Sequence, residues 1–151
     1  MLGADSTWSP ERVADVLGED YGENVPSKYA MWRDHGLAEF FWQRAVPRGP
    51  WEGTHFSVQA HRLAARDGAL INPLIAERYG PFDGPVAFDD VTALLAARGV
   101  ELAEVPYKPD PDEIRTYWQP DSRTLVYVVA GEYYGRAGDV YKVVNPSNGT
   151  P

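Results

Sequence analysis

The feature that most constrains the fold is a regular alternation of apolar and polar residues over positions 54–63. A period of two is typical of a β-strand that turns one face to a core. The apolar face would hold Phe56, Val58 and Ala60. The polar face would meet solvent or a cleft, and it would hold His55, Ser57, Gln59 and His61. A strand of this kind requires a sheet that is packed on at least one side.

The rest of the chain predicts further strands and a few short helices. Capping residues indicate three helix starts, at Ser9, Asn72 and Asp89, and a glycine follows each expected helix. The sequence Asp34-His35-Gly36 predicts a tight turn between strands at 28–33 and 37–45. Other strands are predicted at 100–105, 114–119, 123–130 and 140–144.

Strands therefore dominate, and the length of 151 residues fits one domain. We predict an α+β fold: a single domain with a mostly antiparallel twisted sheet of about six to seven strands and two or three short helices. The domain would span residues 9–145. Residues 1–8 and 146–151 would form an N-terminal and a C-terminal tail.

The charge balance narrows the classes of partner. The chain has 14 Lys+Arg against 22 Asp+Glu, which gives a formal net charge of −8. A nucleic-acid binder needs a basic face, so we expect no nucleic-acid partner. The same charge argues against binding to an anionic membrane surface. No apolar run approaches the roughly 18 residues that a membrane span requires.

Three further observations bear on the compartment and on cofactors. The chain has no cysteine, which excludes a disulfide scaffold, a thiolate metal site and a cysteine nucleophile. Its first residues lack the basic start and apolar stretch of a secretion signal, so we expect a cytoplasmic protein. His55 and His61 would lie about 20 Å apart along a strand, too far to share a metal ion. We therefore expect neither a metal nor a cofactor.

The sequence offers little that would specify a reaction. It lacks a Gly-x-Ser-x-Gly elbow, a glycine-rich phosphate loop and a His-Glu-x-x-His motif. Gln59 and His61 are neighbours on the polar side of the predicted strand, and such a pair could hold a polar ligand. Catalytic activity stays open at this stage, and a non-enzymatic role is favoured.

Two loops have an unusual composition. Asp110, Asp112 and Glu113 place three carboxylates within four residues, and Tyr133 and Tyr134 adjoin each other in a polar loop at 131–138. Loops carried by a rigid sheet are where recognition residues concentrate, and exposed aromatic side chains often anchor a partner. We predict that these five residues form a partner-binding surface.

Four segments, taken in order, resemble a known family type. They are RDHGLAEF at 33–40, VQAHRL at 58–63, YWQPDS at 117–122 and GDVY at 138–141. Over roughly residues 9–145 the chain resembles small actinobacterial proteins of the immunity-protein type, which are encoded near polymorphic toxins. The first segment is similar to an "rDyGLlEf" hairpin, with His35 in the position of the tyrosine.

The resemblance implies a non-enzymatic protein that binds and occludes a cognate toxin. Many such toxins are nucleases with basic clefts, and a partner with a net charge of −8 would be steered toward one. The alternative is a small enzyme or ligand-binding domain with a polar, aromatic-lined cleft around Gln59 and His61. A structural or adaptor module is a third possibility.

Overall fold

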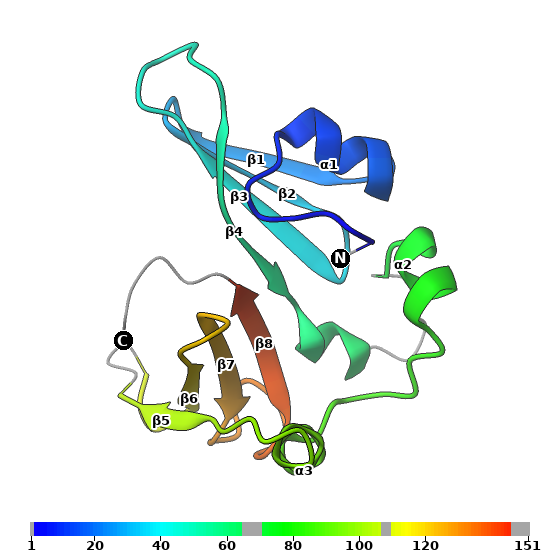
Figure 1. Ribbon diagram of the computed structural model, residues 1–151, viewed down its shortest axis with the longest axis vertical. Coiled ribbons are helices and arrows are strands. Elements are labelled where there is room, and N and C mark those ends of the chain that lie inside the picture. Colours follow the sequence, from blue (N-terminus) through cyan, green and yellow to red (C-terminus); the bar gives the residue numbers. More distant parts are fainter. Residues whose placement is uncertain (1, 65–70, 107–109, 146–151) are drawn as a thin grey trace.

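The strands form one antiparallel sheet, and the helices pack on one of its faces. The computed structural model describes residues 2–64, 71–106 and 110–145 (Figure 1). The strands in these ranges are β1 (Gly22–Ser27), β2 (Ala30–Asp34), β3 (Ala38–Gln43), β4 (Glu52–Val58), β5 (Ala103–Val105), β6 (Ile114–Gln119), β7 (Thr124–Val129) and β8 (Val140–Asn145). Their order in the sheet is β1-β2-β3-β4-β8-β7-β6-β5.

The helices in the described ranges are α1 (Pro10–Leu17), α2 (Pro73–Tyr79), α3 (Phe88–Ala96) and the 3-10 helix η1 (Ala60–Ala64). Two predicted caps are confirmed: the Ser9 hydroxyl accepts from the Arg12 amide, and the Asn72 side chain accepts from the Leu74 amide. The predicted start at Asp89 is wrong. The cap position of α3 is Ala87. Asp89 lies in the first turn, where its negative charge interacts favourably with the positive end of the helix dipole.

The predicted α+β class is confirmed, and the described residues form eight strands where the sequence predicts about six to seven. The additional strand is β1, an edge strand whose residues are all exposed. Because both of its faces meet solvent, it shows no alternation of apolar and polar residues. It also contains Pro26, which a strand tolerates at an edge.

Two apolar clusters lie between the sheet and the helices. The first joins Phe40 and Trp42 of β3 to Val13 and Leu17 of α1 and Ile75 of α2. The second lies on the same face toward β7 and β8, below α3, and its buried members are Ala60, Val126, Val128 and Val140. Figure 1 shows α1 and α2 beside the β1–β4 half of the sheet and α3 beside the other half.

The segment 54–63 differs from its prediction. The strand ends at Val58, and the chain continues into η1, so His61 lies on a 3-10 helix. Phe56 and Val58 pack against the first cluster, and Ala60 is buried in the second, as the alternation indicates. The polar side is not solvated throughout, because Ser57 and Gln59 are 3% and 6% exposed.

Part of the segment predicted as an N-terminal tail packs on the sheet. Ala4 belongs to the first cluster, and Ser6 is also buried. The Trp42 indole donates a hydrogen bond of 2.7 Å to the Trp8 carbonyl. Residues 146–151, predicted as a C-terminal tail, lie outside the described residues.

Candidate functional site

A polar network holds the turn between β2 and β3 to η1. Arg62 of η1 reaches two carboxylates: its Nη1 lies 2.6 Å from Asp34 Oδ1, and its Nη2 lies 2.8 Å from Glu39 Oε1. Arg62 also donates to the carbonyl of Gly36, at the tip of the turn. The Asp34 carboxylate in turn accepts from the Gly36 amide at 2.9 Å. Arg62 therefore fixes the conformation of the turn that the sequence predicts.

The same network explains why Gln59 is buried. Its side-chain amide donates to Glu39 Oε2 at 2.7 Å and to the Ser57 hydroxyl at 2.8 Å. Glu39 thus joins Arg62 on one side to Gln59 on the other. The amide of Gln59 is used within the fold, which leaves it poorly placed to bind a polar ligand.

His61 has different partners from Gln59. Its ring stacks on Tyr141 of β8 at 4.4 Å, and its Nδ1 lies 3.1 Å from the Tyr141 carbonyl oxygen. Burial lowers the pKa of His61, and the hydrogen bond to Tyr141 acts in the opposite direction. The two residues named for a ligand cleft therefore take part in separate contacts.

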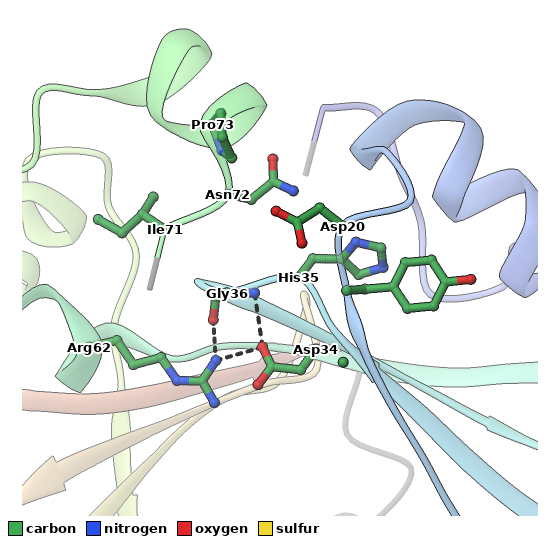
Figure 2. Close-up of a pocket in the computed structure, with 10 residues that line it drawn as sticks. Asp20, Asp34, His35, Gly36, Arg62, Ile71, Asn72 and Pro73 are labelled. Atoms are coloured by element: carbon green, nitrogen blue, oxygen red, sulfur yellow. Dashed lines mark hydrogen bonds and ion pairs between the residues drawn. The ribbon is translucent and has the colours of Figure 1, made fainter. Parts of the chain in front are cut away.

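A polar cavity of ≈ 590 Å³ lies above the β2–β3 turn (Figure 2). It is lined by Asp20, Tyr21, Gly22, Asp34, His35, Gly36, Arg62, Ile71, Asn72 and Pro73. The charged groups in this lining are two aspartates and one arginine, and the arginine is already paired with Asp34. The carboxylates in this lining could accept hydrogen bonds from a small polar or cationic molecule. Among the described residues, this lining includes no serine, threonine, cysteine or lysine that could act as a nucleophile.

His35 is the unusual member of this lining. It is 1% exposed, and neither ring nitrogen has a hydrogen-bond partner within the part of the chain that the structure describes. Its ring contacts those of Tyr21 and Phe40, at centroid distances of 5.2 and 6.1 Å. Burial, and next the Arg33 charge, lower the pKa of His35 to about 4, while Asp34 acts in the opposite direction. His35 is therefore neutral at pH 7, and it packs like an aromatic residue.

The two unusual loops of the sequence lie against each other. The Tyr133 amide donates to Glu113 Oε2 at 2.9 Å, and the amides of Ala130 and Gly131 donate to the Glu113 carbonyl. Desolvation and the Asp110 charge raise the pKa of Tyr134, and a hydrogen bond to Asp110 adds to this effect. The structure thus brings Asp110, Glu113, Tyr133 and Tyr134 together. Asp112, in the same turn, is exposed.

The aromatic rings extend from this contact into the sheet. Tyr133 is 81% exposed and meets Tyr134 edge to face at 4.9 Å. Tyr134 lies 5.3 Å from Tyr141, which stacks on His61. The exposed Tyr133 is thereby supported by rings anchored on β8 and η1. We define Asp110, Asp112, Glu113, Tyr133 and Tyr134 as the tyrosine–acid surface.

With this geometry established, the chain can be compared with other proteins. No family model, curated protein or solved structure matches it. Two further features concern the residues that the structure describes. None of the helices there combines the length and the apolar character that a membrane crossing requires. Those residues also contain no group of three His, Cys, Asp or Glu side chains placed to hold a metal ion.

Arg62, Asp34 and Glu39 are site residues that the sequence reasoning missed. Arg62 lies beside His61 in the segment read as a strand, but its partners are 28 and 23 positions away. A single sequence gives no signal for such a distant pairing. His35 lies in the predicted tight turn, where a side chain is usually solvated, whereas the structure buries it.

Proposed function

We propose that this chain is a non-enzymatic inhibitor of the immunity-protein type, which binds and occludes a basic toxin domain through the tyrosine–acid surface. The observation that carries the proposal is the exposed Tyr133, at 81%, held beside carboxylates by its hydrogen bond to Glu113. A large exposed aromatic side chain on a supported loop is typical of a binding anchor. A toxin antagonist of this kind would act in the cytoplasm.

The charges around Tyr133 favour a basic partner. Asp110, Asp112 and Glu113 lie in the adjoining turn, and the whole chain carries a net charge of −8. Such a field raises the rate of encounter with a basic surface, whereas the buried aromatic contact sets the rate of dissociation. The proposal therefore separates two roles: the carboxylates steer the partner, and Tyr133 and Tyr134 hold it.

The first experiment is a pull-down from the source lysate with the wild-type chain, followed by binding kinetics with the captured protein. Tyr133→Ala and Tyr134→Ala should speed dissociation. If either residue is a hot spot, the loss is about 2 kcal/mol or more. Asp112→Asn with Glu113→Gln should slow association and flatten its dependence on salt. If all four substitutions leave binding unchanged, the proposed surface is wrong.

Matched controls separate this surface from general effects. Tyr29, between β1 and β2 at the opposite edge of the sheet, is 43% exposed, so Tyr29→Ala removes a comparable aromatic side chain. Asp15→Asn with Glu19→Gln removes the same charge from exposed positions in and after α1. Both controls should leave dissociation unchanged, and the charge control should slow association less than the change in the loop.

A second candidate is a ligand-binding domain, and the polar cavity supports it in place of the cleft expected at Gln59 and His61. The cavity adjoins Arg62, Asp34 and the buried His35. If no protein partner is captured, a thermal-shift screen of small polar and cationic molecules tests this function. A shift that Asp34→Asn abolishes and Tyr133→Ala leaves intact would assign the ligand to the cavity.

A further inference from the structure

The apolar space beneath α3 is unusual because the helix leaves it unfilled. No residue of α3 is buried, although Val91 and Leu95 face the sheet across this space. On the sheet side, the space is lined by Val126 and Val143, and toward its inner part also by Val140. Valine is short, so these side chains do not fill the gap as Phe40 and Trp42 fill the first core.

Two adjoining spaces result. One has a volume of ≈ 290 Å³ and is lined mainly by apolar residues, which include Leu37, Phe82 and Val86. The other, a groove of ≈ 520 Å³, runs between α3 and the sheet past Leu95 and Leu102. Both are lined by Val91, Val126 and Val143, so they meet at those side chains. The groove lies within the roughly 300–1,000 Å³ typical of small-molecule sites.

The outer end of the groove is polar. Gln119, Asp121, Ser122 and Thr124 line it there, in the turn between β6 and β7. Within the turn, the backbone amide and the hydroxyl of Ser122 each donate to Gln119 Oε1 at 2.6 Å. The side-chain amide of Gln119 donates to Asp121 Oδ2 at 3.3 Å. Among the described residues that line the groove, Asp121 is the one with a charge. A group at this end would therefore meet a negative charge.

We propose that the groove is a binding site for an amphipathic molecule with one hydrocarbon chain and a cationic amine head. The chain would lie against Val91, Leu95, Val126 and Val143, and the head would lie beside the Asp121 carboxylate. The valine and leucine side chains that line the rest of the groove favour a hydrocarbon over water, because they offer water no hydrogen-bond partner. The charge of Asp121 disfavours a carboxylate head. This site is separate from the tyrosine–acid surface.

The test uses the purified full chain with n-dodecylamine and dodecanoate below their micelle concentrations and dodecan-1-ol below its solubility limit. Dodecylamine should raise Tm and bind with a measurable Kd in calorimetry. Dodecan-1-ol should bind more weakly, and dodecanoate weakest of the three. n-Butylamine, which has the same head and a short chain, should not raise Tm. If butylamine matches dodecylamine, or if none of the long-chain compounds shifts Tm, the proposal is overturned.

Variants locate the site. Leu95→Gln places an amide in the groove wall and should raise the Kd for dodecylamine at least tenfold. Leu94→Gln is the matched control, because Leu94 is the adjacent residue of α3 and is 61% exposed. It should leave the Kd unchanged. Asp121→Asn should remove the preference for dodecylamine over dodecan-1-ol. Equal binding by the two leucine variants would show that the compounds bind elsewhere, which also overturns the proposal.

Discussion

Arg62 and Asp34 are 28 positions apart in the chain, and their side chains meet at 2.6 Å. This contact joins η1, which follows β4, to the turn between β2 and β3. Arg62 is well shielded, with 18% of its side chain exposed, and it also binds Glu39. Desolvation opposes the charge of Arg62, but the hydrogen bonds and charges of Asp34 and Glu39 prevail and raise its pKa.

Arg62→Gln should destabilise the fold by about 2–3 kcal/mol, because it leaves two partly buried carboxylates without their cation. The exposed ion pair of Arg115 with Glu104 is the control: both side chains are about half exposed, so solvent screens the pair and Arg115→Gln should cost clearly less than Arg62→Gln. Urea denaturation measures both variants. Equal losses would mean that the Arg62 network contributes no more than a surface ion pair.

His35 predicts a dependence of stability on pH. Its pKa is about 4 in the folded chain against 6.5 for the free side chain, so the folded state binds a proton less readily than the unfolded state. The stability that follows from this difference is complete above the unfolded pKa and falls as the pH drops toward the folded value. Between about pH 7.5 and about pH 5 the loss from His35 should be about 2 kcal/mol.

His35→Phe should remove this part of the pH dependence. It also replaces two unpartnered ring nitrogens with carbon, in a position between Tyr21 and Phe40, so the variant should be more stable than wild type at neutral pH by about 1–2 kcal/mol. Urea denaturation at both pH values gives the comparison, because carboxylate titration is common to both proteins. Parallel pH profiles for the two proteins would contradict the assignment of this dependence to His35.

The elements that the sequence predicts correctly are those set by residues close together in the chain. The caps at Ser9 and Asn72 and the turn at Asp34-His35-Gly36 depend on residues within three positions, and the structure has them. The features that the sequence did not predict depend on contacts between residues far apart in the chain. Alternation alone could not show that Glu39 would bury Gln59, nor that η1 would end β4 at Val58. The contact between the Glu113 and Tyr133 loops spans 20 positions, and composition suggested it only because both loops were unusual.

Phe40 and Phe56 stack on each other but differ in burial, so their substitution by alanine should differ in its cost to stability. Phe40 is 1% exposed and stacks on Phe56 at 5.5 Å, while Phe56 is only partly buried. Phe40→Ala should cost about 3–5 kcal/mol, the range for a large cavity in a closed core. Phe56→Ala should cost less, because part of its ring already meets water. Chemical denaturation tests the order, and a larger loss for Phe56→Ala would place the centre of this core elsewhere.

Gly53 of β4 allows the N-terminal segment to pack closely on the strand. A Cβ at this position would overlap the carbonyl oxygen of Ser6 and would lie 3.1 Å from the carbonyl oxygen of Trp8. The Trp8 carbonyl accepts the indole hydrogen bond of Trp42, so a displaced segment would also disturb the first core. Gly53→Ala should therefore destabilise the fold by about 1–3 kcal/mol and alter the tryptophan fluorescence of the folded state. Gly22→Ala is the matched control in a strand, since its Cβ would meet nothing closer than Asp34 Cβ at 3.9 Å, and it should be neutral or slightly stabilising. Wild-type stability and fluorescence in Gly53→Ala would show that the N-terminal segment does not pack against β4.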